Sequence, residues 1–311
     1  MGGNALTLAS VSRYALCMSI FIDVTGAAVS LDSSPARVVS LVPSVTETVF
    51  AIGAGARLVG RTRYCVRPDP EVRALEKVGG TKDPDIAKIV ALKPDLVLAN
   101  REENRKSDIE GLRAAGLRVF VDEPVTVEQG LAMVSLLGRM LDCEGSADAI
   151  VRQGAQELNA IRMRVIELDA QNALKLKPRS RTRPRVLAFI WRDPWMIAGS
   201  PTYIADMLRC LGAELAFDSP TLGEELKRKR DSQRYFAVDA SEVAEMAPDI
   251  LIFPDEPYAF TEGDFAYWRE AAPHVPAVKE GRLRLCSGQD LSWFGSRTPG
   301  ALQRLQPLVS W

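Results

Sequence analysis

The first half of the chain alternates short apolar runs with segments of helical period. The runs at residues 37–42, 95–99 and 118–121 are rich in valine and leucine and are too short to be helices. Apolar side chains on both faces are typical of strands that are buried in a parallel sheet. Helical segments occur at residues 85–92 and 108–115. This alternation predicts a parallel sheet that is covered by helices.

The second half of the chain repeats this order of elements. Residues 185–190 begin with Arg-Val, as does the run at 37–42. A helical segment at 240–246 is followed by Pro-Asp and by the apolar run 250–253, and the same order occurs around residue 95. The similarity is weak in sequence but clear in architecture. It predicts two related lobes.

A long helical segment separates the two halves. From residue 127 to about residue 168 the pattern is helical, with one interruption near residues 143–146. An apolar stripe on an otherwise charged surface indicates a helix of about five to six turns. The stripe consists of Ile150, Ala155, Leu158, Ile161 and Val165.

We therefore predict an α/β fold of two Rossmann-like lobes with parallel sheets, joined by a single long α-helix. The first lobe is expected at residues 18–143, the connecting helix with its loop at 144–183, and the second lobe at 184–311. Residues 1–17 are apolar only in patches, are interrupted by Arg13, and lack the pattern of a secretory signal or of a membrane span. We interpret them as an extension or a misassigned start, so the chain as written favours a cytoplasmic location.

Composition and charge argue against several functions. The 311 residues carry a net charge of −1, which gives no reason to expect nucleic acid or an acidic membrane as partner. Basic stretches at 179–185 and 227–234 are interpreted as solvated loops. The five cysteines are widely spaced, which fits a reducing compartment better than a disulfide-stapled protein. The single histidine, His274, argues against a histidine zinc site and a Ser–His–Asp site.

Helix starts are predicted by two capping boxes. Ser44 to Glu47 reads Ser-Val-Thr-Glu and directly follows the run 37–42. It is expected to place a helix N-terminus at the carboxyl end of a strand, where open α/β sheets bind ligands. Thr126 to Gln129 is a second such box. Carboxylate pairs such as Glu102-Glu103 are interpreted as solvated faces.

Aromatic and basic side chains follow the predicted strands of both halves. Trp191 and Trp195 come directly after the run 185–190, in a polar loop that contains proline. Large apolar faces with a few polar groups suit a flat, bulky ligand. The alternative is that both indoles pack beneath the second lobe. The other residues in such positions are Arg61, Tyr64, Asn100, Arg101, Tyr258, Trp293 and Arg297.

Several segments in both halves of the chain resemble the vitamin B12-type substrate-binding proteins of ABC importers. Within these proteins, they resemble the helical-backbone metal receptors, or class III periplasmic binding proteins. The resemblance implies that a metal chelate (a corrinoid, haem or ferric siderophore) is bound without catalysis between the lobes of a monomer, for uptake by an ABC permease. It implies no covalent cofactor, no metal held by the protein itself and no transmembrane segment, and members of the family are periplasmic or at the cell surface. The likeness is carried by residues 38–47, 78–82, 91–97, 100–105, 190–195, 256–258 and 292–297.

The resemblance and the pattern at the strand ends together define the candidate site. Thr81 and Asn100 stand where corrinoid binders often carry tryptophan, which weakens the case for cobalamin itself. The family's permease-docking glutamates align with Ala87 and Ser241, so we assign docking to the neighbouring Asp85 and Glu242. The predicted ligand-binding residues are Ser44, Tyr64, Lys82, Asn100, Arg101, Trp191, Trp195, Glu256, Tyr258, Trp293 and Arg297.

Two alternatives on the same scaffold stay open. The unclear signal, the cysteines and the altered docking positions also fit a cytosolic chelate carrier or sensor without a permease. The carboxylates near the aromatic residues fit a chelate-processing enzyme.

Overall fold

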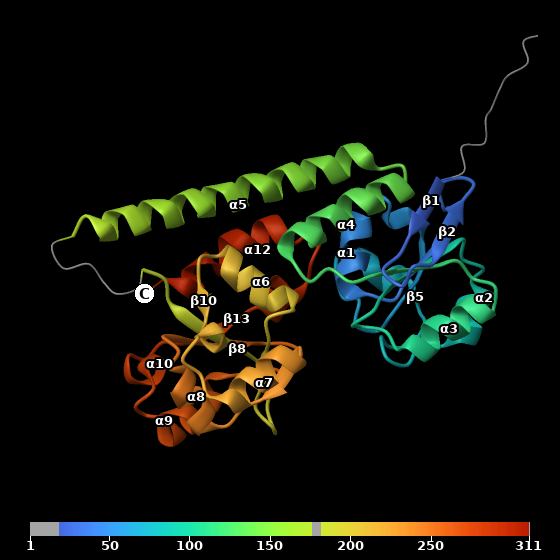
Figure 1. Ribbon diagram of the computed structural model, residues 1–311. Helices are drawn as coiled ribbons and strands as arrows, with labels where there is room; N and C mark the ends of the chain where they lie inside the picture. Colours follow the sequence, from blue (N-terminus) through green and yellow to red (C-terminus); the bar gives the residue numbers. More distant parts are fainter. Residues whose placement is uncertain (1–18, 176–181, 311) are drawn as a thin grey trace, which may run out of the picture.

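The computed structural model describes residues 19–175 and 182–310, which form two α/β lobes bridged by a long helix (Figure 1). Within these residues the first lobe contains a five-stranded sheet in the order β5-β4-β3-β6-β7. All four strand pairings are parallel, as the pattern of apolar runs predicts. The strands are β3 (Val38–Ser40), β4 (Leu58–Arg61), β5 (Glu76–Lys77), β6 (Leu96–Asn100) and β7 (Val119–Asp122).

Helices cover both faces of this sheet. Ile89 and Leu112 belong to one apolar cluster with Val39 of β3, and Val49 belongs to a second cluster with Val38. Because neighbouring residues of a strand point to opposite faces, the two clusters lie on the two sides of the sheet. The elements outside the sheet are β1 (Ser19–Ile22), β2 (Ala28–Leu31), α1 (Pro43–Ala51), α2 (Ile86–Ala91), α3 (Lys106–Ala114), and 3-10 turns at Gly55–Arg57 and Glu71–Ala74.

The predicted break in the helical segment separates two helices, α4 (Val127–Met140) and α5 (Glu144–Ala173). α5 has 30 residues, which corresponds to about 45 Å. Figure 1 shows it starting beside α4, near the first lobe, and running across the second lobe. α4 and α5 pack closely because Gly154 has no side chain: a Cβ atom there would lie 2.7 Å from Leu131. The long connecting helix is confirmed, but with 30 residues it has about eight turns and is longer than the five to six turns predicted.

The second lobe contains a mixed sheet. Its main path is β11-β9-β8-β12-β13, and β10 pairs with β8. β8, β10, β12 and β13 pair in parallel, whereas β9 pairs antiparallel with β8 and with β11. The chain therefore turns back directly after β8, in a segment that the sequence predicts as a loop. The strands are β8 (Arg185–Trp191), β9 (Met196–Ala198), β10 (Glu214–Leu215), β11 (Tyr235–Ala237), β12 (Ile250–Pro254) and β13 (Leu283–Cys286).

Helices and an aromatic cluster complete the second lobe. Phe189 of β8 stacks on Phe253 of β12, with ring centroids 5.0 Å apart. Phe189 also contacts the fully buried Trp268, and Phe253 contacts Phe265. The helices are α6 (Tyr203–Cys210), α7 (Glu224–Ser232), α8 (Ala240–Met246), α9 (Phe265–Ala271), α10 (Pro276–Lys279), α11 (Gly288–Ser292) and α12 (Thr298–Leu305), with 3-10 turns at Ala216–Asp218, Glu262–Asp264 and Gln306–Val309.

The predicted capping box at Ser44 is wrong. α1 begins at Pro43, its N-cap is Val42, and no side chain caps it. Proline is favoured in the first turn because the amide that it lacks has no partner there in any case. Ser44 is therefore buried inside the first turn, and Glu47 is free to pair elsewhere. The second box is half formed, because Thr126 caps the amide of Gln129 while the Gln129 side chain accepts from another amide.

Residues 1–17, predicted to be an extension, lie outside the described residues. Among the helices that the structure describes, none combines the length and the apolar character needed to cross a membrane.

Candidate functional site

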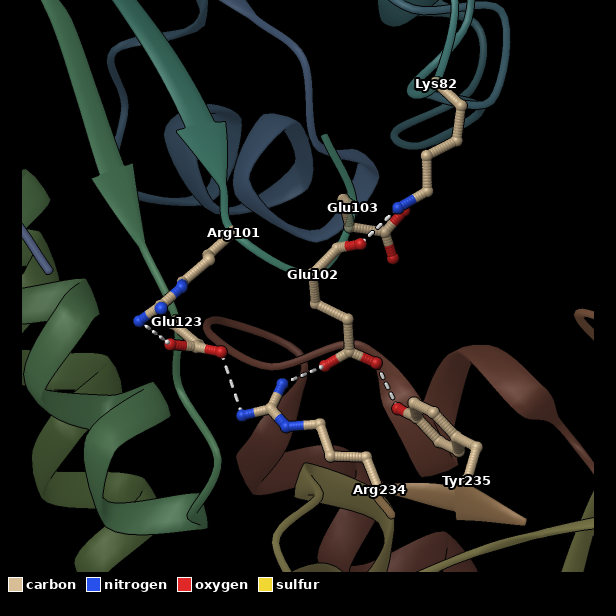
Figure 2. A pocket seen from close by; sticks show the side chains of 7 residues that line it. All are labelled: Lys82, Arg101, Glu102, Glu103, Glu123, Arg234 and Tyr235. Atoms are coloured by element: carbon tan, nitrogen blue, oxygen red, sulfur yellow. Dashed lines mark hydrogen bonds and ion pairs between the residues drawn. The ribbon is translucent and has the colours of Figure 1, made fainter. Parts of the chain in front are cut away.

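An open pocket of about 820 Å³ lies between the two lobes. Figure 2 shows that charged side chains from both lobes point into it. The first lobe contributes residues that follow the carboxyl ends of β6 and β7, which is where open α/β sheets bind ligands. The lining residues are Lys82, Arg101, Glu102, Glu103 and Glu123 of the first lobe, and Arg234 and Tyr235 of the second.

A hydrogen-bonded turn at the end of β6 sets the direction of the pocket carboxylates. The Asn100 side-chain oxygen accepts from the amides of Glu102 (2.8 Å) and Glu103 (3.1 Å). Its amide nitrogen donates to Asp122 (2.7 Å), and its backbone amide donates to Asn104 (2.8 Å). Asn100 is only 3% exposed. It positions the turn from below the pocket.

Two side chains of the second lobe, Arg234 and Tyr235, join it to the first lobe at the rim of the pocket (Figure 2). Arg234 of the second lobe pairs with Glu123 at 2.9 Å and with Glu102 at 3.3 Å. Arg101 pairs with Glu123 from the first lobe, at 3.3 Å. The hydroxyl of Tyr235 donates to Glu102. Burial, and then the neighbouring Glu102 charge, raise the pKa of Tyr235, so this hydroxyl stays protonated and remains a donor.

Glu103 differs from the other pocket carboxylates because no hydrogen bond or ion pair to its carboxylate occurs among the described residues. Lys82 lies beside it, but the Lys82 ammonium donates to the backbone oxygen of Glu102. Burial raises the pKa of Glu103, and the Glu102 charge raises it further, while Lys82 opposes both. Glu256 of the second lobe also raises this pKa, so it lies within electrostatic reach.

Glu256 follows β12 and is held by residues near α11. Burial raises its pKa, while hydrogen bonds from the side chains of Trp293 and Gln289 lower it. Gly288 is required at this place, because a Cβ atom there would lie 2.4 Å from Cγ of Glu256. The carboxylate therefore has a defined position on the second lobe.

Aromatic side chains are exposed on both lobes. The Trp191 indole is 44% exposed and meets the Tyr258 ring edge-on at 5.7 Å. Tyr64 of the first lobe is 52% exposed and lies under the guanidinium of Arg63. Trp195 behaves differently: it is 7% exposed and stacks on Phe260 inside the second lobe. The structure does not bring Trp195 to the pocket.

Arg297 joins the lobes away from the pocket lining. It donates to both oxygens of Glu47 across the lobe boundary, at 2.6 and 2.9 Å, and to Asp290 at 2.9 Å. It also lies over the Trp293 ring, 5.4 Å from the centroid. Burial lowers the pKa of Arg297, but the two carboxylates outweigh burial and the pKa is raised. We call this group (Arg297, Glu47 and Asp290) the inner clamp.

The predicted ligand-binding residues therefore separate into groups. Lys82 and Arg101 line the pocket, and Asn100 supports it. Trp191 is the last residue of β8, and Glu256 and Tyr258 follow β12, whereas Trp293 is buried directly after α11. Ser44 is buried in α1, 4% exposed, without a capping role.

The two predicted docking residues have structural partners. Asp85 is exposed and caps α2 by accepting from the Lys88 amide at 3.0 Å. Glu242 belongs to a capping box at the start of α8 with Asp239 and pairs with Lys229. Docking by Asp85 and Glu242 stays a prediction.

Five pocket residues were not predicted as ligand contacts, namely Glu102, Glu103, Glu123, Arg234 and Tyr235. The interpretation of Glu102 and Glu103 as a solvated face is wrong, since both line the pocket. The stretch 227–234 is not simply a solvated loop either: it contains part of α7 and ends at Arg234 in the pocket. The usable signal was the position of these carboxylates directly after a buried strand. Among the described residues, no group of three His, Cys, Asp or Glu side chains is arranged to hold a metal ion.

Two α/β lobes joined by one long helix, with a pocket between them, define a two-lobed ligand-binding protein. The chain belongs to the periplasmic binding protein family, whose family model matches residues 38–289. This confirms the predicted family and its fold.

Curated relatives and solved structures agree with this assignment. The chain is 37% identical over 112 residues to the vitamin B12-binding protein of Photorhabdus laumondii, and 33% identical over 128 residues to that of Yersinia pestis. These matches cover 36% and 41% of this chain, and the chain spans 40% and 45% of the length of the two relatives.

Two solved structures share the fold over most of the chain. The periplasmic haem-binding protein RhuT of Roseiflexus sp. RS-1 has a TM-score of 0.70 at 20% identity, covering 88% of this chain and 97% of that one. The periplasmic vitamin B12-binding protein BtuF of Vibrio cholerae has a TM-score of 0.69 at 20% identity, covering 88% and 96%.

Proposed function

We propose that this protein binds a metal chelate (a corrinoid, haem or ferric siderophore) reversibly between its lobes and delivers it to an ABC-type importer. The observation that carries the proposal is the inter-lobe pocket, because residues at the strand ends of both lobes line it. A ligand held there contacts both lobes at once. The relatives named for vitamin B12 and haem support the class of ligand.

Tryptophan fluorescence tests this function directly. The exposed indole of Trp191 lies on the second lobe, so a bound chelate should quench it. We expect saturable quenching by at least one of cyanocobalamin, dicyanocobinamide, haem and a ferric siderophore, with Kd below about 100 μM, or about 5.5 kcal/mol. Because these ligands absorb light and can lower the fluorescence signal without binding, calorimetry should be used as a second method and should give the same Kd. Failure of all of them to bind would overturn the proposal.

A charge reversal locates the ligand. Arg234→Glu places a carboxylate beside Glu102 and Glu123 and should weaken chelate binding at least tenfold. Arg228→Glu makes the same change on the surface of the same lobe, where the side chain is 77% exposed. Its affinity should match that of the unaltered protein. Equal affinities for all three proteins would place the ligand outside this pocket.

The permease partner and the location belong to the same proposal. We propose the family's periplasmic or cell-surface location. Fractionation of native cells, followed by detection of this chain, tests it. Recovery with the cytosolic fraction alone would favour a carrier or sensor without a permease.

A further inference from the structure

The charged side chains that line the pocket differ in whether they form hydrogen bonds or ion pairs. Of the three cationic side chains in the lining, Arg101 and Arg234 are paired with carboxylates. Lys82 donates to a backbone oxygen. Glu103, in contrast, points into the pocket without a hydrogen bond or ion pair among the described residues (Figure 2).

The turn at the end of β6 holds Glu103 in this position. Its amide donates to Asn100, which is itself buried and bonded to Asp122. The turn therefore fixes the backbone of Glu103, and with it the point from which the carboxylate enters the pocket. A partly desolvated carboxylate without a partner is unfavourable, and a donor supplied by a ligand would relieve this cost.

The surrounding carboxylates reinforce this preference. Glu102 is adjacent, and Glu256 contributes from the opposite lobe. Both raise the pKa of Glu103, whereas Lys82 lowers it by less than burial and Glu102 raise it. A negatively charged group of a ligand placed here would face carboxylates from two lobes, while an amide or a cation would face acceptors.

We infer that Glu103 is a specificity-determining residue, which selects chelates that present an amide, an amine or another cationic donor and disfavours chelates that present carboxylates. This inference rests on the proposed function. The unpaired Glu103 would repel a chelate that presents carboxylates and would accept a hydrogen bond from a chelate that presents a donor. Specific sites generally combine repulsion of one ligand with attraction of another.

Matched ligand pairs test the inference. Dicyanocobinamide carries peripheral amides, and dicyanocobyrinic acid carries carboxylates on the same corrin ring. Haem diamide and haem form a second pair. We expect the amide form of whichever pair binds to have a Kd at least tenfold lower than the carboxylate form.

Substitutions test whether Glu103 sets this ratio between the Kd of the carboxylate form and the Kd of the amide form. Glu103→Gln should reduce the ratio at least fivefold, mainly by tightening the carboxylate form. Glu225→Gln, at a carboxylate that is 72% exposed on α7, should leave the ratio unchanged. Circular dichroism and the melting temperature show whether each variant is folded.

The outcomes separate the two proposals. If no member of either pair binds, the inference about Glu103 fails; if no ferric siderophore binds either, the proposed function fails as well. If both members of a pair bind equally, or if Glu103→Gln leaves the ratio as it was, only the inference about Glu103 is overturned.

Discussion

Asp122 should make the stability of the protein depend on pH. The side chain is 8% exposed at the end of β7, where burial raises its pKa from 3.8 to about 7, and the Glu103 and Glu123 charges add to this while Asn100 opposes it. In the pH range between these two values the folded protein binds a proton that the unfolded chain does not bind. The free energy of unfolding therefore falls as the pH rises through this range and levels off above about pH 7.

The magnitude follows from the two pKa values. The difference between 3.8 and about 7 corresponds to about 4 kcal/mol at about 1.4 kcal/mol per pKa unit. About 3 kcal/mol of this falls between about pH 5 and pH 8. Asp122→Asn removes the titration but keeps an oxygen that can accept from Asn100 at 2.7 Å. The variant should therefore gain about 3 kcal/mol relative to the unaltered protein between these pH values.

Urea unfolding at several pH values, followed by circular dichroism, measures this difference. Asp32→Asn, at an aspartate that is 63% exposed, controls for the loss of one charge and should change stability by less than about 0.5 kcal/mol. Parallel stability profiles for Asp122→Asn and the unaltered protein would refute the reasoning, because they would mean that Asp122 does not titrate in the folded state in this range.

Three further substitutions test the contacts around the site. Arg297→Met leaves the largely buried Glu47 without its cation and removes one of the two arginines that pair with Asp290, so it should destabilise the protein by about 3 kcal/mol in thermal melts; an unchanged melting temperature would argue against the inner clamp. Gly288→Ala forces a Cβ atom against Glu256 and should cost about 1–3 kcal/mol, whereas Gly145→Ala, in open space at the start of α5, should be neutral or stabilising by up to about 1 kcal/mol. Tyr235→Phe removes a donor that joins the lobes and should speed chelate release several-fold in stopped-flow experiments; an unaltered off-rate would show that this bond is absent in the bound state.

The fold was predictable because its signals are local. The strands at Val38–Ser40 and Leu96–Asn100 are buried on both faces, and an apolar run without alternation is how such strands appear in a sequence. The long helix showed its apolar stripe directly. The antiparallel strand β9 was missed because it has three residues and follows β8 through a tight turn.

The site was less predictable because it depends on how the lobes meet. Arg234 lies far from Glu102 in sequence, and no local pattern shows that the two will pair. The indoles illustrate the same limit within one lobe. Trp191 is the last residue of β8 and is exposed, while Trp195 lies beyond the turn and is buried. They are four positions apart in the sequence, and only the path of the turn decides which indole is available to a ligand.

The two sets of inter-lobe ion pairs differ in their contact with water. The inner clamp is shielded, since the Arg297 side chain is 16% exposed, whereas Arg234 at the rim is 32% exposed. Dissolved ions weaken exposed pairs much more than shielded ones. A higher ionic strength should therefore weaken the ion pairs of Arg234 at the pocket entrance, while the inner clamp keeps the lobes joined. A chelate should enter and leave faster in a saline medium than in a dilute one, which would make the rate of capture depend on the ionic strength around the protein.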